Sequence, residues 1–184
     1  MNEKQAIQQL KNGDIRGLEF LVECHQVKAV RTAYLITRDI SLAEDIVQNA
    51  FIQAYHSIGG FDTTRPFGPW FMRSVVNASV KMMQRSARQI QVGEDEADES
   101  LLDDLVTQVE SVEAQVESLE VQNQIWEAMQ KLSPRQRAVI VQRYFLEMSE
   151  KEMAEEAGSA VGTVKWMLNA ARERLRGLLE RSEK

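Results

Sequence analysis

Apolar residues recur every three or four positions along most of the chain, which is the spacing of one buried face of an α-helix. The clearest run covers residues 43–58, where Ala, Ile, Val, Phe and Tyr side chains repeat without a lapse. Similar runs predict helices over residues 2–12, 14–37 and 110–131, the first of them ended by Gly13. Alternation of apolar and polar residues, which marks a strand, is scarce. We therefore expect an all-α protein.

Capping residues and glycines separate the predicted helices. Ser41, with Glu44 three positions later, predicts a capping box, in which side chains and backbone N–H groups bond reciprocally at a helix start. Gly59–Gly60 ends that helix, and a loop over Phe61–Pro69 precedes a helix over Trp70–Arg88. Three or four helices of this length can bury a common core.

Residues 133–176 carry the pattern of a helix-turn-helix. Ser133 and Pro134 open one helix, with Gln136 completing a capping box. Ser149 opens the next helix in the same way, with Glu152 as its partner. Two helices joined by a short turn can place the second helix in a DNA major groove, so nucleic acid is the leading candidate partner.

The last helix follows a turn at Gly158, and Ser159 is expected to cap it. Its predicted buried stripe consists of Val161, Val164, Leu168, Ala171, Leu175 and Leu178. The outer face then holds Ser159, Thr163, Lys165, Trp166, Asn169 and Arg172. For Trp166, packing within the core or between domains and contact with a thymine methyl or a sugar are equally compatible with the sequence.

The formal net charge of −6 is concentrated in one segment. Residues 91–125 contain eleven Asp and Glu and no Lys or Arg. Residues 1–90 and 126–184 are both mildly basic. We interpret residues 91–108 as a mobile acidic linker between two basic domains, with a helix over 110–131 joining the second. The small excess of cations in each domain predicts modest DNA affinity for the chain alone.

Several function classes find no support in the sequence. No apolar run approaches the roughly 18 residues that a membrane helix needs, and the first residues lack the apolar core of a signal peptide. Cys24 is the single cysteine, so no internal disulfide is expected. Cys24–His25 is half of a metal site at most, because structural zinc needs four ligands. No nucleophilic triad, phosphate-binding loop or dinucleotide motif is present, so we expect no enzyme and no cofactor.

Aromatic and basic side chains alternate between Phe61 and Arg88, as they do on surfaces that bind single-stranded nucleic acid. For Trp70 and Phe71, the helix core is the favoured interpretation. The segment Pro66–Pro69 is as compatible with a binding loop as with simple structure. Charged helix faces, like the polar residues beside the apolar stripe of residues 43–58, are most often only solvated.

Four segments together resemble the extracytoplasmic-function sigma factors, the compact two-domain bacterial initiation factors. These segments are Asp45–Phe51 (DIVQNAF), Trp70–Asn77 (WFMRSVVN), Leu132–Arg137 (LSPRQR) and Val161–Lys165 (VGTVK). The resemblance covers essentially the whole chain. It implies two helical domains: sigma region 2 over residues 1–90, and sigma region 4 over residues 111–184 beyond an acidic linker at 91–110.

The resemblance also implies partners and roles. The expected partners are core RNA polymerase, bound through its clamp helices and flap, promoter DNA and an anti-sigma factor. The chain would be a monomer when free and would bind polymerase as one copy. Its expected location is the bacterial cytoplasm, at the nucleoid. Polymerase contacts would be Asp45, Gln48 and Phe51. Contacts to the −10 element would be Phe61, Arg65, Phe67, Trp70, Asn77, Lys81, Arg85 and Arg88, with a flipped base held by the loop Phe61–Phe67. Contacts to the −35 element would be Ser159, Thr163, Lys165, Trp166, Asn169 and Arg172.

The sequence departs from the family pattern in the last helix. Trp166, Met167 and Ala170 stand where relatives carry a small residue and two arginines, which predicts weaker phosphate anchoring. Two other hypotheses remain compatible with the residues alone. One is a dimeric helix-turn-helix repressor that binds a palindromic site without polymerase. The other is a helical adaptor that sequesters a protein partner and binds no DNA.

Overall fold

The computed structural model describes residues 1–89 and 123–182, and within these residues all regular structure is helical. The chain divides into two compact units, Met1–Gly93 and Glu94–Lys184. This confirms the predicted all-α class with two small helical domains. The predicted linker at 91–110 and the start of the helix at 110–131 lie outside the described residues.

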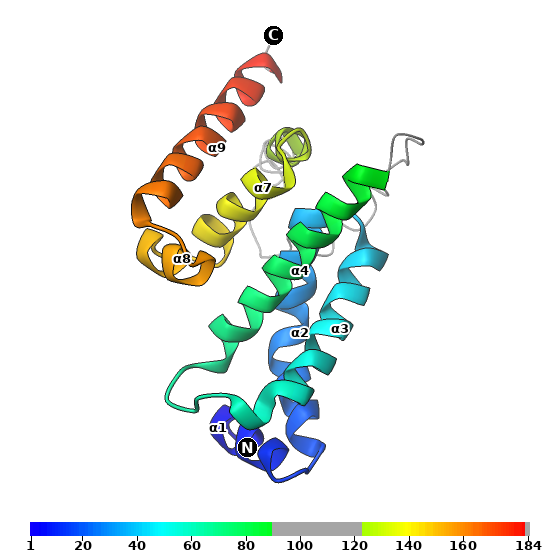
Figure 1. Cartoon of the computed structure of the whole chain (residues 1–184). Helices are drawn as coiled ribbons and strands as arrows, with labels where there is room; N and C mark the ends of the chain where they lie inside the picture. The colour runs from blue at the N-terminus through cyan, green and yellow to red at the C-terminus, as the bar shows by residue number, and fades with distance from the viewer. Residues whose placement is uncertain (90–122, 183–184) are drawn as a thin grey trace, which may run out of the picture. The chain divides into compact units, whose positions relative to one another are not determined.

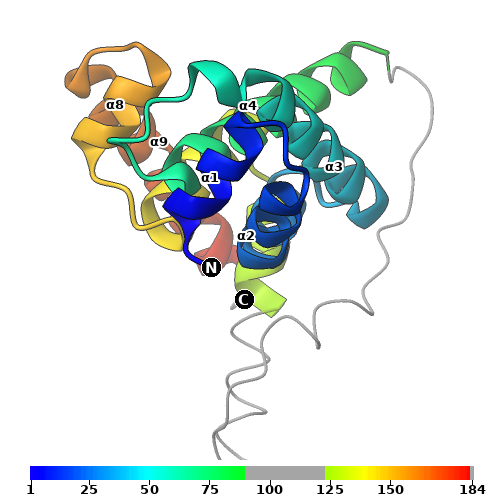
Figure 2. The ribbon, with the colours of Figure 1, turned by 90° about the horizontal axis from the view of Figure 1, so that it is seen from below.

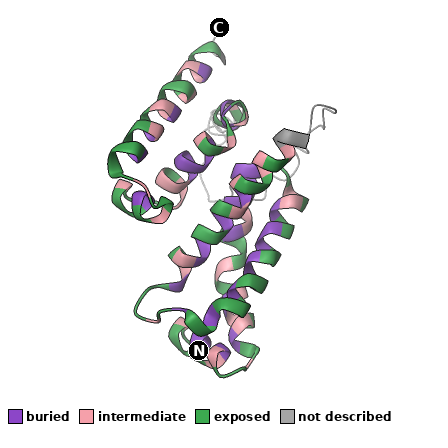
Figure 3. Cartoon of the chain, in the orientation of Figure 1, coloured by how far each residue is buried: buried purple, intermediate pink, exposed green. Residues whose placement is uncertain are grey.

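The first unit consists of α1 (Glu3–Lys11), α2 (Arg16–Thr37), α3 (Ile40–Ser57), the short 3₁₀ helix η1 (Ile58–Gly60) and α4 (Phe67–Gln89). Helices α2, α3 and α4 lie side by side, and α1 lies against the end of this bundle where the chain turns from η1 into α4 (Figures 1 and 2). The apolar stripes predicted from the sequence meet between the three long helices, as the buried positions in Figure 3 show. The core at this end is aromatic, with Phe67 and Phe71 fully buried.

Two predicted boundaries in this unit differ from the structure. Helix α3 is capped by Asp39, whose carboxylate accepts a hydrogen bond from the Leu42 N–H at 2.9 Å, and not by the predicted Ser41–Glu44 box. Helix α4 begins at Phe67, so the predicted loop ends three residues early. Pro69 is accommodated in the first turn of α4, where a backbone N–H would have no partner within the helix.

The second unit contains a helical segment at residues 123–130, α7 (Pro134–Ile140), the π-helical turn η3 (Val141–Phe145), α8 (Glu150–Ala157) and α9 (Val161–Ser182). Its core is formed by a contiguous apolar set that includes Met153, Val164 and Leu168. Arg137 is also buried, and its guanidinium donates to the carbonyls of Gln130 and Leu132. These bonds satisfy acceptors at the end of the preceding helix.

Candidate nucleic-acid interface

One face of α3 is polar at one end and partly apolar at the other. Asp45 and Gln48 are exposed, and the same face continues through Ile52 and Tyr55, which are 46% and 36% exposed. We call Asp45, Gln48, Ile52 and Tyr55 the α3 face. Ile52 does not fit the three- and four-residue spacing of the buried stripe, so the sequence pattern already indicated that it is exposed. Tyr55 was assigned to the buried stripe, and the structure corrects this.

Phe51 does not belong to the α3 face. It is 6% exposed, and its ring stacks on that of Phe71 with the centroids 4.2 Å apart. The aromatic core holds this side chain inside the unit in the free chain, and the contact of Phe51 with polymerase stays a prediction. Phe51 packs on the buried side of α3, opposite the α3 face.

Four aromatic side chains cluster where the 61–66 loop joins α4. The ring centroid of Phe61 lies 4.9 Å from Trp70 and 5.9 Å from Phe67, and Phe67 stacks on Phe71 at 5.6 Å. Phe61, Phe67 and Phe71 are buried, whereas Trp70 is half-buried. The core interpretation is therefore confirmed for Phe71. Phe61 and Phe67 are covered by their aromatic neighbours in the free chain, and their contacts with the −10 element stay predictions.

The exposed part of the 61–66 loop is organised by Asp62. Its carboxylate accepts hydrogen bonds from the Thr64 hydroxyl at 2.7 Å and the Thr64 N–H at 2.9 Å, and Arg65 lies 3.7 Å away. The Thr64 hydroxyl and N–H bonds, with smaller contributions from Arg65 and Lys11, hold the pKa of Asp62 below its usual value of 3.8. The carboxylate is therefore charged at neutral pH, and the turn it organises is retained until the pH falls through this lowered pKa.

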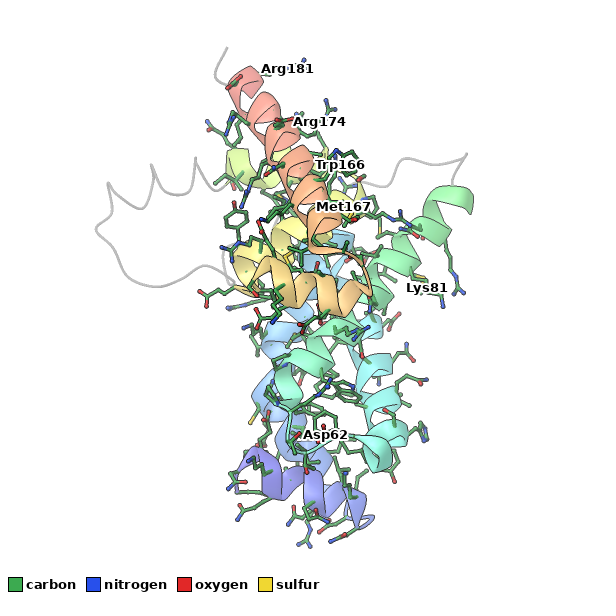
Figure 4. The ribbon with its side chains drawn as sticks, turned by 60° about the vertical axis from the view of Figure 1, so that its left-hand side comes forward. Asp62, Lys81, Trp166, Met167, Arg174 and Arg181 are labelled. Carbon is green, nitrogen blue, oxygen red and sulfur yellow. The ribbon has the colours of Figure 1, made fainter. Side chains whose placement is uncertain are left out.

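The exposed face of α4 carries cations beyond the aromatic cluster. We call Trp70, Arg73, Asn77, Lys81 and Arg85 the α4 face, since they follow one another at helical spacing and all but Trp70 are exposed. Figure 4 shows Asp62 on the loop and Lys81 farther along α4. Arg88, the last predicted contact, is in α4, but its side chain lies outside the described set. Arg73 is a candidate that the sequence prediction omitted, although it lies in the same basic segment.

The helix-turn-helix of the second unit forms as its capping residues predict. The capping boxes of Ser133 and Ser149 are both present. Hydrogen bonds from the Ser149 hydroxyl and N–H lower the pKa of Glu152 from its usual value of 4.5. Ser159, however, does not cap α9: its buried hydroxyl has no hydrogen-bond partner among the residues that the structure describes. The Ala160 carbonyl instead accepts backbone hydrogen bonds from Thr163 at 3.0 Å and from Val164 at 3.3 Å.

Gly158 gives a direct test of this turn, because it ends α8 in the left-handed conformation with φ of +58°. Gly158→Ala should destabilise the second unit by about 1 kcal/mol, since an L side chain is strained there even though space is free. Gly177→Ala is the matched control, because Gly177 lies inside α9 and no atom of the described residues lies within 4 Å of its Cβ position. This substitution should stabilise by ~0.5–1 kcal/mol. Urea unfolding of both variants measures the difference, and equal effects would contradict this role of the turn.

The outer face of α9 presents Thr163, Lys165, Trp166 and Asn169, which we call the α9 face. Trp166 is 71% exposed and projects from the N-terminal half of the helix (Figure 4). It is therefore not part of the core of its own unit. Val161 is also exposed, contrary to the predicted stripe, because it is the first residue of α9 and precedes the part that packs on α7 and α8.

Arg172 links the α9 face to the π-helical turn η3. Its Nε donates to the Tyr144 hydroxyl at 2.8 Å, its guanidinium lies 5.6 Å from the centre of that ring, and its Nη1 lies 3.4 Å from the Asn169 amide oxygen. The Lys165 Nζ lies 3.8 Å from a Glu150 carboxylate oxygen on α8. Tyr144 and Glu150 thus contact predicted DNA-reading residues, and the sequence pattern gave no signal for either contact.

Cys24–His25 was considered as half of a metal site. In the structure, His25 instead bonds to Glu3 and contacts the ring of Phe67. Among residues 1–89 and 123–182, no three His, Cys, Asp or Glu side chains come together in a way that suits a metal ion. Within the same residues, no helix is both long enough and apolar enough to cross a membrane.

Comparison with known proteins places both units in one family. The family described as Sigma-70 region 2 matches residues 21–89, and Sigma-70 region 4 matches residues 122–175. The ECF RNA polymerase sigma factor SigW of Bacillus subtilis is 32% identical over 176 residues, covering 94% of each chain. The RNA polymerase sigma-H factor of Pseudomonas aeruginosa is 25% identical, covering 93% of this chain and 90% of its own.

Two solved structures share the fold. CnrH in complex with the cytosolic domain of CnrY gives a TM-score of 0.64 at 24% identity, over 97% of each chain. The sigma factor RpoE of Bartonella quintana, in complex with the anti-sigma factor NepR, gives 0.65 at 23% identity, over 88% of this chain and 97% of RpoE. With both sigma regions matched in order and a relative of this identity along nearly the whole length, the chain belongs to the extracytoplasmic-function sigma factors of RNA polymerase.

Proposed function

We propose that this sigma factor divides its work among three surfaces: the α3 face for core polymerase, the 61–66 loop with the α4 face for the −10 element, and the α9 face for the −35 element. As a member of its family, the chain directs core RNA polymerase to promoters. The observation that carries the assignment is the separation of exposed polar and cationic faces on α3, α4 and α9 from the buried stripes of the same helices.

The α3 face suits a protein partner. A protein interface combines an apolar centre with a polar rim, and Ile52 and Tyr55 supply apolar surface beside the carboxylate of Asp45 and the amide of Gln48. The matching surface on polymerase would be the clamp helices expected from the family resemblance. Asp45 would then fix register and partner choice through its charge.

The 61–66 loop and the α4 face suit an unwound strand. Trp70 is half-buried on the edge of the aromatic cluster, so part of its ring is available for stacking. Arg73, Lys81 and Arg85 follow it along the helix and would hold successive phosphates, while Asn77 can bond to a base edge. Capture of an unstacked base at the loop would offset the few kcal/mol that unpairing costs.

The α9 face suits duplex DNA. Helix α9 is the second helix of the helix-turn-helix, the one that enters the major groove in this motif. Thr163 and Asn169 can bond to base edges, and Trp166 can cover a thymine methyl. Lys165 is the only Lys or Arg among the four residues of this face, so we expect it to hold DNA phosphates weakly. Most of the affinity for the promoter would then come from polymerase.

Glu150 gives a test of the α9 face. Its carboxylate pairs with Lys165 at 3.8 Å and would repel nearby phosphates. Glu150→Gln should therefore strengthen binding to a −35 duplex by about two- to fivefold, since exposed ion pairs are worth up to ~1 kcal/mol. Lys151→Gln, on the same turn of α8, removes a positive charge instead and should not strengthen it. Duplex affinity of the polymerase complex at two salt concentrations measures both, and weaker binding by Glu150→Gln would contradict the proposed role of Lys165.

An inhibitory protein partner is also proposed. The solved RpoE structure is a complex with the anti-sigma factor NepR, and CnrH was solved with the cytosolic domain of CnrY. An anti-sigma factor would act most simply by covering the α3 face and the apolar side chains that α9 leaves exposed, Val161 and Trp166. We further propose that the chain works in the bacterial cytoplasm at the nucleoid, as one copy per polymerase.

The test is a selection of genomic DNA fragments by the full chain with and without core polymerase, followed by sequencing. The proposal expects fragments that share two conserved elements, retained only when chain and core are both present. A palindromic site retained by the chain alone would instead favour a repressor. Retention of no DNA in the presence of core would favour an adaptor.

A further inference from the structure

Helix α1 lies outside residues 21–89, the part that matches sigma region 2, yet it is firmly seated on the first unit. Ala6, Ile7 and Leu10 are buried against the bundle. Gly17 of α2 faces the Ala6 carbonyl so closely that a Cβ at this position would collide with that backbone oxygen. Such a close approach fixes α1 in one position relative to α2.

The C-terminal end of α1 holds the start of the 61–66 loop. Lys11, in the last turn of α1, donates a hydrogen bond from Nζ to the Phe61 carbonyl at 2.7 Å. The two residues are fifty positions apart in the sequence, and the bond is partly buried. Lys11 also contributes to the lowered pKa of Asp62, the residue that organises the loop.

The N-terminal end of α1 holds the end of the same loop through His25. The Glu3 carboxylate accepts a hydrogen bond from His25 Nε2 at 2.8 Å, and the His25 ring lies 5.5 Å from that of Phe67. Next to Phe67, Gly68 packs so closely on His25 that a Cβ there would stand 3.1 Å from the ring. The two ends of the loop are thus anchored to opposite ends of α1.

We propose that α1 is a brace for the 61–66 loop and that Lys11 is a positioning residue for base capture at the −10 element. This inference rests on the proposed role of the loop. A loop fixed before binding loses less conformational freedom when a base enters, so anchoring raises its affinity for the unstacked base. A backbone carbonyl held by a charged donor also keeps its direction, which sets where the exposed Thr64 and Arg65 lie.

The test measures base discrimination by the reconstituted polymerase holoenzyme. Open-complex formation is followed by permanganate reactivity on promoters that differ only at one −10 base. Lys11→Met should reduce the preference for the best base by about tenfold while core binding stays within twofold of the original chain. Lys11→Arg, which keeps a charged donor, should restore most of the preference. Lys4→Met removes an exposed charge from the same helix and should leave the preference unchanged.

Base preference separates positioning from simple loss of fold, because unfolding lowers activity equally on every promoter. If Lys11→Met keeps the base preference of the original chain, the proposed role of α1 is wrong. This holds also when open-complex formation falls equally on all promoters. If Lys11→Met does not fold, Glu3→Gln weakens the opposite anchor, and an unchanged preference in that variant has the same meaning. If the original chain shows no preference at any −10 base, the proposed role of the loop itself fails.

Discussion

Reversing the charge of one residue, with Asp45→Arg, is expected to weaken binding of the chain to core polymerase by about 30- to 100-fold. Asp45 is exposed on the α3 face, so the substitution removes no packing from the core. A like charge set against a complementary surface costs several kcal/mol, of which ~2–3 kcal/mol would give this loss. Asn49 donates its side-chain amide to the Asp45 main-chain carbonyl at 2.8 Å, a bond that does not involve the substituted carboxylate.

The measurement is a titration of labelled core polymerase with each full-length variant. Glu23→Arg is the matched control, because Glu23 is an exposed carboxylate on α2 and lies outside the α3 face. It should bind as the original chain does. Circular dichroism should show the same helix content for both variants. Equal affinity of Asp45→Arg and the original chain for core polymerase would show that the α3 face does not bind it.

The second large effect is expected on stability. Phe71 is fully buried between Phe51 and Phe67, with ring centroids 4.2 and 5.6 Å away. Phe71→Ala would leave a cavity among these rings, and truncation of a buried Phe typically costs ~3–5 kcal/mol. A loss of this size in a domain of this length lowers the melting temperature by more than about 12 °C.

Hydrogen exchange of the full-length chain, read from peptides of α2 to α4 during urea unfolding, reports the first unit separately from the second. Phe71→Ala should expose the first unit at lower urea and leave the peptides of α8 and α9 unchanged. Tyr55→Ala is the control, since Tyr55 is exposed on the α3 face: it should retain stability and weaken core binding. A fully stable Phe71→Ala variant that loses only DNA binding would show that this ring contacts DNA and is not part of the core.

Local signals in the sequence predicted the helix-turn-helix well. The boxes at Ser133 and Ser149 and the left-handed Gly158 all depend on residues within four positions of one another. The prediction was wrong at Ser41 because Asp39, which follows the left-handed Arg38, has the extended backbone that an N-cap requires. It was wrong at Ser159 because α9 begins at Val161, two residues later.

In the aromatic segment, composition alone does not predict which side chains are buried. Phe61, Phe67 and Trp70 have similar chemistry, but the packing of the 61–66 loop against α4 buries the first two and leaves Trp70 half-buried. Helical spacing predicts which residues share a face, whereas the neighbour that covers this face depends on the fold. The bond between Lys11 and the Phe61 carbonyl could not be predicted, since a main-chain acceptor fifty residues away leaves no mark in the sequence.

Promoter-directed initiation is tested most directly by run-off transcription from a DNA fragment selected with the full chain and core polymerase. We expect a transcript of defined length only when core and chain are both present, and none with core alone or with the chain alone. Asp45→Arg should give far less transcript than the original chain when both are used at a concentration close to the affinity of the original chain for core. A transcript that forms equally without the chain, or no transcript from any selected fragment in the presence of both, would contradict promoter-directed initiation.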